Sequence, residues 1–239
     1  MALTDEQNLY NHALDLIGEY QVTESDTSSK QAEACARNYA TSRDEVLRSH
    51  LWNEAIARSC VLQSTTAPIH GYSYKYLIPS DCLRILSIGS DLYEWRSEGG
   101  YILTDYIIMP DEWATATAYV AGQYVQVSDV TYVCVTSHTS SVWATEGAYW
   151  TTQTGDYGYI NLEYIKQLTT ITSFSPQLYK AIYYNLAIKI AAHLTGDMKN
   201  KAVLIKEYEE LVMPQARSVD SMQGTPRTIY NSYWKRSRG

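Results

Sequence analysis

Lys and Arg are absent from residues 97–165, a stretch that contains eight acidic residues. The whole chain has a net charge of −7, and the other segments carry −5 over residues 1–96, +2 over residues 166–214 and +4 over residues 215–239. Non-specific nucleic-acid binding needs clustered cations that displace counterions from the phosphates. We therefore expect the middle of the chain to repel a phosphate backbone, and only the C-terminal end offers a basic surface to nucleic acid or to an acidic protein.

Other features are scarce as well. No apolar run reaches the ~20 residues of a membrane span, and no basic N-terminal region followed by an apolar run indicates a signal peptide. The four cysteines, Cys35, Cys60, Cys82 and Cys134, form no C-x-x-C pair, so we expect buried free thiols made in a reducing compartment. A single Phe stands against 22 Tyr and 6 Trp. Tyrosine suits interfaces and half-buried sheet faces, although compositional drift would give the same count.

The common catalytic motifs are also missing. The sequence has no glycine-rich phosphate loop, no G-x-S-x-G, no H-E-x-x-H and no acidic calcium loop. The five histidines, His12, His50, His70, His138 and His193, show no ligand spacing, and we expect each to be a surface or hydrogen-bonded core residue. Adjacent carboxylates such as Glu209 and Glu210 point in different directions on a helix. We expect no enzyme, no metal and no cofactor; the alternative is an active site that only folding assembles.

Helix start and stop signals predict two helices at each end of the chain. Thr4 with Gln7 forms a capping box, and Gly18 stands where that helix should end. A longer helix follows residues 23–29 and ends near His50. Ser175-Pro176 begins a third helix, as N-cap and first helical residue. Asp197 caps a fourth helix, which Pro214 should kink or end.

Short apolar segments between the helices predict strands. They are Ala55–Gln63, Tyr74–Ile78, Leu83–Ile88, Tyr93–Arg96, Tyr101–Leu103, Tyr106–Met109 and Tyr159–Thr170. Gly99-Gly100 indicates a hairpin turn. Alternation over residues 124–127 and 131–135 predicts two further strands of a small sheet within the cation-free block.

The expected fold class is α+β. It combines a helical bundle, made of two N-terminal and two C-terminal helices, with a small antiparallel β domain and an inserted small all-β module. The expected segments are 1–110 and 155–226 for the two parts of the host domain, 111–154 for the insert and 227–239 for an extended C-terminal arm.

Several motifs outside the insert occur together in a fixed order. They are Leu14-Asp15-Leu16-Ile17-Gly18-Glu19, Arg43-Asp44-Glu45-Val46-Leu47, His50-Leu51-Trp52-Asn53-Glu54-Ala55, Tyr74-Lys75-Tyr76-Leu77-Ile78-Pro79-Ser80-Asp81-Cys82-Leu83-Arg84-Ile85, Leu103-Thr104-Asp105, Tyr164-Ile165, Phe174-Ser175-Pro176, Ala181, Leu186-Ala187 and Tyr208. In this order and spacing they resemble the head-to-tail adaptor, or tail tubular protein A, family of short-tailed bacteriophages. The insert and Pro214 depart from that pattern.

This resemblance implies a structural virion protein at the head–tail interface, made in the host cytoplasm. It implies a twelve-subunit ring that joins the portal protein to a tail nozzle similar to tail tubular protein B. Double-stranded DNA would pass through the ring during ejection without specific binding. The resemblance implies no catalytic residue.

The insert resembles a chitin-binding-type carbohydrate-binding module of family 5/12. The matching residues are Trp113, Tyr119, Gly122, Val125, Tyr132-Val133-Cys134 and Trp150. Trp143 and Tyr149 lie in the loop where such modules carry the aromatic rings that stack on sugars, so these two are the candidate carbohydrate contacts and a host glycan is a candidate partner. Trp113, Tyr119, Tyr132 and Trp150 are expected to fill the small core. The alternative for the whole module is contact with a neighbouring subunit or capsid protein.

The C-terminal arm combines aromatic and basic side chains. Its candidate contact residues for the portal are Arg227, Tyr230, Tyr233, Trp234, Lys235, Arg236 and Arg238. Aromatic residues anchor interfaces and cations steer a segment toward acidic patches. We expect the arm to dock in a portal groove; a frayed terminus is the alternative.

Overall fold

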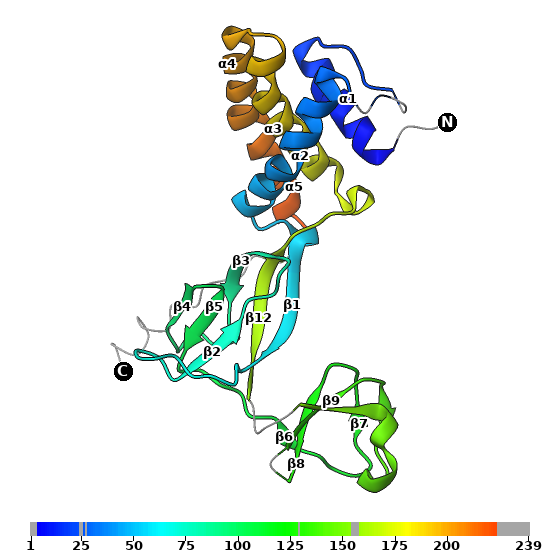
Figure 1. The fold of residues 1–239 in the computed structure, drawn as a ribbon, viewed down its shortest axis with the longest axis vertical. Helices are drawn as coiled ribbons and strands as arrows, with labels where there is room; N and C mark the ends of the chain where they lie inside the picture. The colour runs from blue at the N-terminus through cyan, green and yellow to red at the C-terminus, as the bar shows by residue number, and fades with distance from the viewer. Residues whose placement is uncertain (1–3, 24–25, 27, 129, 154–157, 224–239) are drawn as a thin grey trace. The chain divides into compact units, whose positions relative to one another are not determined.

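The chain is a mixed α+β protein that divides into two compact units (Figure 1). The computed structural model describes residues 4–23, 26, 28–128, 130–153 and 158–223. One unit contains Met1–Ile56 and Gln167–Gly239, and its described part is helical. The other contains Ala57–Lys166 and consists mainly of strands. The N-terminal and the C-terminal helices therefore share one unit, as the blue and the yellow-to-orange helices of Figure 1 illustrate.

Helix α1, Asp5–Ile17, begins and ends where its sequence signals predict. The Thr4 hydroxyl accepts a hydrogen bond from the Gln7 N–H at 3.2 Å, and the Gln7 side chain accepts one from the Thr4 N–H at 3.0 Å. Gly18 ends the helix with φ +72°, a left-handed conformation that glycine adopts without steric cost.

Helix α3, Pro176–Leu194, packs against α1, against α2 (Lys30–Ser49) and against the last helical segment. The Ser175 hydroxyl accepts a hydrogen bond from the Leu178 N–H at 3.3 Å, and Pro176 occupies the first turn, so the predicted start is confirmed. The buried residues of α3 are Leu178, Ala181, Ile182, Leu186, Ala187, Ile190 and Ala191. These side chains form the centre of the helical unit.

Pro214 does not end the last helical segment. Helix α4, Met198–Glu207, leads into a π-helical turn, Tyr208–Val212, and the chain continues as α5, Met213–Ser221. Pro214 has no N–H to donate to the carbonyl four residues earlier. The wider π-helical turn comes directly before it, and the Met213 N–H donates to the Tyr208 carbonyl five residues back. The loss of one helical hydrogen bond is thus accommodated within a continuous helical path.

The first part of the strand-rich unit contains two three-stranded sheets, with the orders β1-β12-β3 and β2-β5-β4. The strands are β1 Ile56–Leu62, β2 Tyr74–Leu77, β3 Cys82–Ser87, β4 Trp95–Glu98, β5 Tyr101–Thr104 and β12 Tyr159–Lys166. Gly99 and Gly100, with φ +57° and +84°, make the predicted hairpin between β4 and β5.

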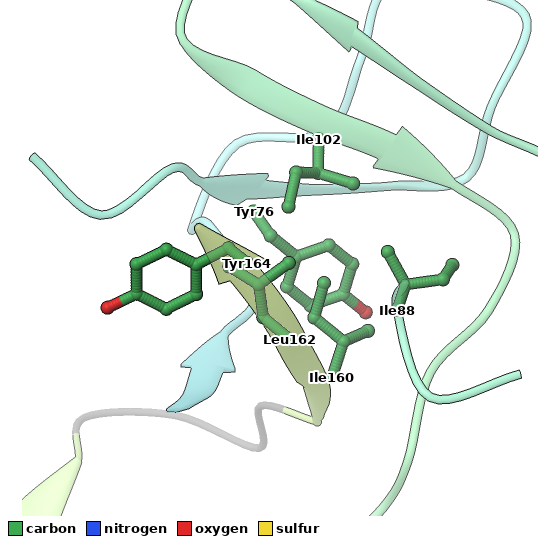
Figure 2. Close-up of a cluster of buried hydrophobic side chains, with 6 residues drawn as sticks. All are labelled: Tyr76, Ile88, Ile102, Ile160, Leu162 and Tyr164. Atoms are coloured by element: carbon green, nitrogen blue, oxygen red, sulfur yellow. The ribbon is translucent and has the colours of Figure 1, made fainter. Parts of the chain in front are cut away.

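A cluster of buried side chains joins these two sheets (Figure 2). Ile160, Leu162 and Tyr164 alternate along β12, so all three point to one face of that strand. Tyr76 of β2 and Ile102 of β5 meet them from the second sheet, and Ile88 follows β3. The strand that follows residues 111–153 therefore completes a core begun by the strands that precede this segment.

The predicted strand Tyr106–Met109 is wrong. In this segment the structure has one isolated bridge, between Ile108 and Tyr159. The Tyr106 N–H donates to the Thr104 hydroxyl at 3.1 Å, and the Tyr106 carbonyl accepts from the Tyr76 hydroxyl at 3.0 Å. Side chains thus use the backbone groups that a strand ladder would need.

Residues 111–153 form two small sheets with a core of their own. The strands are β6 Asp111–Glu112, β7 Ala118–Tyr119, β8 Tyr124–Val127, β9 Val130–Cys134, β10 His138–Thr139 and β11 Trp150–Gln153. One sheet has the order β11-β9-β8-β6 and the other pairs β10 with β7. The predicted strands at 124–127 and 131–135 are present as β8 and β9, while β6 pairs in parallel with β8.

The expectation that all four cysteines are buried holds for only two of them. Cys35 and Cys134 are buried and Cys82 is intermediate, but Cys60 is exposed on β1. The Cys60 thiol lies 3.3 Å from Oδ1 of Asn161 on the neighbouring strand β12, to which it donates. All four are free thiols, as expected.

A buried carboxylate ties the end of α5 to the segment that follows α2. Asp220 Oδ1 accepts from the Asn53 N–H at 3.0 Å, and Oδ2 lies 3.1 Å from Nε2 of His50. The Asp220 carbonyl also accepts from the Asn53 side-chain amide at 2.6 Å. Asp220 is only 4% exposed, so few water molecules can replace these partners.

We expect Asp220→Ala to lower the free energy of unfolding by roughly 2–3 kcal/mol, because the Asn53 N–H and the His50 ring lose a charged partner. Urea unfolding of the full chain measures the change. Glu209→Ala, at an exposed position on the same segment, is the control and should change stability little. Equal effects of the two substitutions would contradict the role given to Asp220.

Candidate functional site

The aromatic side chains of residues 111–153 fall into a buried and a half-exposed group. Tyr119 and Trp150 are buried together with Val125 and Cys134. Trp113, Tyr132 and Trp143 are partly buried and pack against that core. The expectation of core residues therefore holds for Tyr119 and Trp150, whereas Trp113 and Tyr132 lie between core and solvent.

Trp143 is held by other aromatic rings. Its ring packs edge-to-face against Tyr132, with centroids 4.7 Å apart, and against Trp113 at 5.5 Å. Its third ring contact, with Trp150, has a centroid distance of 5.7 Å. This predicted carbohydrate contact is thus half-buried, with its orientation fixed from three directions.

Tyr149 is the more exposed of the two predicted carbohydrate contacts, at 38%. Its ring is stacked on the His138 imidazole, with centroids 4.2 Å apart and planes 15° apart. His138 in turn contacts Trp150 at 5.4 Å. Trp143 and Tyr149 are therefore connected through Trp150 and His138, in one chain of ring contacts.

An open cavity of about 340 Å³ lies beside Trp113. Its lining residues are Glu112, Trp113, Gln126, Val127 and Ser128. Ligand pockets combine apolar or aromatic walls with a few polar groups that fix orientation. A carboxylate, an amide and a hydroxyl next to an indole ring are groups that can contact a sugar.

Among the described residues of this segment, Glu146 is the most heavily hydrogen-bonded carboxylate, and its side chain is 3% exposed. Oε1 accepts from the Ser141 N–H, and Oε2 accepts from the Trp150 indole N–H at 3.3 Å. Oε2 also lies 3.3 Å from Nε2 of His138. Glu146 thus fastens both ends of the loop that carries Trp143 and Tyr149.

The pKa of Glu146 is lowered from its usual value. Burial alone would raise that pKa, because it disfavours the charged form. The hydrogen bonds from Ser141, Trp150 and His138, together with the charge of His138, outweigh the burial. The carboxylate is therefore ionised in the folded protein at neutral pH.

Cys134, His138 and Glu146 resemble a nucleophile, a base and an orienting acid in their order of contact. The Cys134 sulfur lies 3.8 Å from Nδ1 of His138. That nitrogen is closer to the Thr136 carbonyl, at 2.9 Å, and burial raises the pKa of the Cys134 thiol. A buried thiol with a raised pKa and no free base is a poor nucleophile. We therefore assign the three residues a structural role.

Sequence reasoning missed the pairing of His138 with Glu146. It treated the histidines as scattered and looked for carboxylate pairs only at adjacent positions. The sequence did contain a signal for this pair: His138 is the only His, Lys or Arg between Arg96 and Lys166. A buried carboxylate in this segment has no other cation of the segment to pair with.

The helical unit presents a different kind of candidate surface. Four large apolar side chains between the start of α4 and the residue that follows α5 are exposed: Met198 at 65%, Val203 at 55%, Leu211 at 65% and Met222 at 78%. Apolar residues exposed singly are normal on a protein surface, whereas a contiguous patch of them is typical of an interface. This segment is the candidate contact surface for another protein chain.

The predicted portal-contact residues Arg227, Tyr230, Tyr233, Trp234, Lys235, Arg236 and Arg238 lie outside the described residues. Within the described part, no group of three or more His, Cys, Asp or Glu side chains is placed to hold a metal ion. A search of the same residues finds no helix with the length and apolar character of a membrane span.

Comparison with known proteins gives no family assignment: no protein-family model matches the chain, and a search of curated proteins finds no match.

We expect acid to weaken the structure around Glu146. Because its pKa is lower in the folded protein, Glu146 contributes stability that is present above the pH at which an unfolded glutamate titrates, about 4.3. This contribution is lost as the pH falls through the lower folded pKa. Glu146→Gln should remove this pH dependence and cost about 1–3 kcal/mol at neutral pH, since the Ser141 and Trp150 donors lose a charged acceptor.

Tryptophan emission of the full chain during urea unfolding, measured between about pH 3 and pH 7, tests this expectation. Glu112→Gln is a matched control, because Glu112 is exposed in the same segment. Identical pH profiles for wild type and Glu146→Gln would contradict the assignment.

Proposed function

We propose that the chain is a structural virion protein of a short-tailed bacteriophage, a ring-forming adaptor between the portal protein and the tail nozzle. The exposed apolar side chains of α4–α5 carry this proposal. In an isolated subunit they stay in water, and burying them against a neighbouring copy is favourable by roughly 25 cal/mol per Å². A ring of identical subunits covers the same surface in every copy.

The arrangement of the helices and of the inserted module is part of this proposal. The two N-terminal helices and the C-terminal helical segments would form the ring wall as one bundle. Residues 111–154 would be an accessory module inserted in the host domain. The assembled ring would lie at the head–tail interface of the virion, with twelve copies as the resemblance to the adaptor family implies.

The charge distribution supports passage of DNA without capture. Residues 97–165 contain no Lys or Arg, and Glu98, Asp111 and Glu112 are exposed within this block. Protein surfaces hold duplex DNA chiefly through Lys and Arg on its phosphates. A surface that lacks them lets a duplex slide past.

The composition of the C-terminal arm, residues 227–239, supports its role in portal contact. It has three aromatic residues, Tyr230, Tyr233 and Trp234, and four basic residues, with no acidic one. A segment of this composition gains affinity by inserting its rings and gains specificity from its charges. The proposed receptor is a groove with acidic walls on the portal.

We expect the purified full chain to assemble as a ring of twelve on purified portal rings. Val203→Glu and Leu211→Glu should each reduce assembly at least tenfold, because a charge would have to be buried against the next copy. Leu92→Glu is the matched control, since Leu92 is 90% exposed but lies in the strand-rich unit. Native mass spectrometry of the mixtures measures the assembly.

Two results would count against the adaptor. One is a wild-type chain that ignores the portal. The other is a loss of assembly with Leu92→Glu that equals the loss with Leu211→Glu. A chain that lacks residues 227–239 tests the arm separately: unchanged binding to the portal would remove the arm from the proposal and leave the ring in place.

A second candidate function, carbohydrate recognition through the aromatic-rich module, is favoured by the Tyr149 ring. One face of this ring is covered by His138 while the residue remains 38% exposed, which is the arrangement of a stacking platform. Trp143, half-buried, is held nearby through Trp150, and the cavity beside Trp113 adds polar groups. A host surface glycan is the proposed ligand of this function.

We expect Tyr149→Ala and Trp143→Ala to weaken retention of the full chain on an insoluble glycan about tenfold, which corresponds to about 1.4 kcal/mol. Chitin, cellulose and host surface polysaccharide are the supports to compare. Tyr20→Ala removes a Tyr that is 86% exposed in the helical unit and should leave retention unchanged. If the wild-type chain is not retained on any of the three supports, this second function is excluded.

A further inference from the structure

The His138 ring is enclosed by hydrogen-bond acceptors at both nitrogens. Nδ1 lies 2.9 Å from the Thr136 carbonyl oxygen, and Nε2 lies 3.3 Å from Glu146 Oε2. The side chain is 8% exposed, so water has little access to either nitrogen. A carbonyl oxygen and an ionised carboxylate cannot donate hydrogen bonds, so each nitrogen must supply its own hydrogen.

A neutral imidazole carries a hydrogen on only one nitrogen. If it were on Nδ1, the lone pair of Nε2 would face the Glu146 carboxylate; if on Nε2, the lone pair of Nδ1 would face the Thr136 carbonyl. Either arrangement buries two acceptors against each other, which is costly. The contacts are satisfied together only when the ring is an imidazolium.

We infer that His138 is doubly protonated in the folded protein and that this buried proton locks the loop between Ser141 and Trp150, which carries Trp143 and Tyr149. The imidazolium holds Glu146 by charge, and Glu146 holds the Ser141 N–H and the Trp150 indole. Tyr149 also belongs to this arrangement, because its ring is stacked on the His138 ring. His138 is thus a positioning residue for both aromatic side chains of the loop, the exposed Tyr149 and the half-buried Trp143.

The groups that face His138 favour this charge state. Glu146 supplies the negative charge, and no Lys or Arg occurs in residues 97–165 to oppose a cation. The Cys134 thiol, 3.8 Å from Nδ1, has a raised pKa and stays neutral. Tyr119, Tyr149 and Trp150 contact the ring as aromatic neighbours.

The lock makes the loop sensitive to alkali. Stability supplied by a protonated histidine is present at low pH and is lost when the pH rises far enough to remove the proton. This loss is separate from the acid transition, in which Glu146 becomes protonated.

The first test is nitrogen-15 NMR of the full chain with labelled histidine at about pH 6.5. Glu146→Gln identifies the His138 resonances. The inference requires both ring nitrogens of His138 to carry hydrogen, and Glu146→Gln to return the ring to its neutral form. A hydrogen on Nδ1 alone, or on Nε2 alone, in the wild-type protein overturns it. This measurement on the wild type needs no substitution at His138.

The second test compares unfolding between about pH 6 and pH 9, followed by tryptophan emission. The wild-type transition should shift to lower urea concentration as the pH rises, and His138→Gln should abolish this shift. His70→Gln, at an exposed position, is the matched control and should keep the wild-type profile. A wild-type profile in His138→Gln would overturn the lock even if the ring proved to be charged.

Both tests work without any ligand, so their outcome is independent of the adaptor and carbohydrate proposals. Where the chain is retained on a glycan, the lock predicts that retention falls with rising pH in the wild type and in His70→Gln. Retention that is constant to pH 9 while the ring loses its proton would show that the lock does not position Tyr149. Absence of retention at every pH would exclude carbohydrate recognition and leave the lock standing.

Discussion

The burial of helix α3 is the constraint on which the helical unit depends. Leu178, Ile182, Leu186 and Ile190 are fully buried, and α1, α2 and the last helical segment all pack on this one helix. In proteins, most of the stability of a helix comes from the tertiary packing of its apolar face. Without α3, the apolar faces of α1 and α2 would lack their main partner. The N-terminal helices are therefore stable only in the presence of the C-terminal third of the chain.

Residues 111–153 are stabilised by a polar network in addition to apolar packing. Their buried apolar core consists of Tyr119, Val125, Cys134 and Trp150, which is small for an independent fold. The hydrogen-bonded carboxylate of Glu146 adds cross-links between loop, strand and ring that apolar packing alone does not supply. This network buries the charge of Glu146, which is tolerated only while every hydrogen-bond partner is present. The hydrogen bonds and charges that hold the loop therefore also make its stability depend on pH.

Much of the local structure could be predicted from the sequence, and the failures have identifiable causes. The capping box at Thr4 and the Ser175-Pro176 start are confirmed, because both depend on residues within one turn of each other. The strand at Tyr106–Met109 failed, because Tyr76, thirty residues away, takes up the carbonyl of Tyr106. The exposure of Cys60 could not be inferred, because the prediction of burial rested on the residue type and not on its position in a strand.

The candidate site, too, was predicted only in part. Trp143 and Tyr149 were selected by resemblance, and the structure places both on one loop, although Trp143 is half-buried. The partnership of His138 with Glu146 escaped the sequence analysis, because it depends on a loop closing over eight residues and on the loss of water from both groups. The arm residues from Arg227 onward remain sequence-based predictions.

The division of the chain into units also bears on the order of folding during synthesis. Ala57–Lys166 is one uninterrupted stretch, whereas the helical unit is assembled from the two flanking stretches. Domains generally fold as units when their last residue has left the ribosome. The strand-rich unit can therefore be complete while α1 and α2 still await α3. Over that interval, the apolar faces of the first two helices are exposed to chaperones or to other nascent copies of the chain.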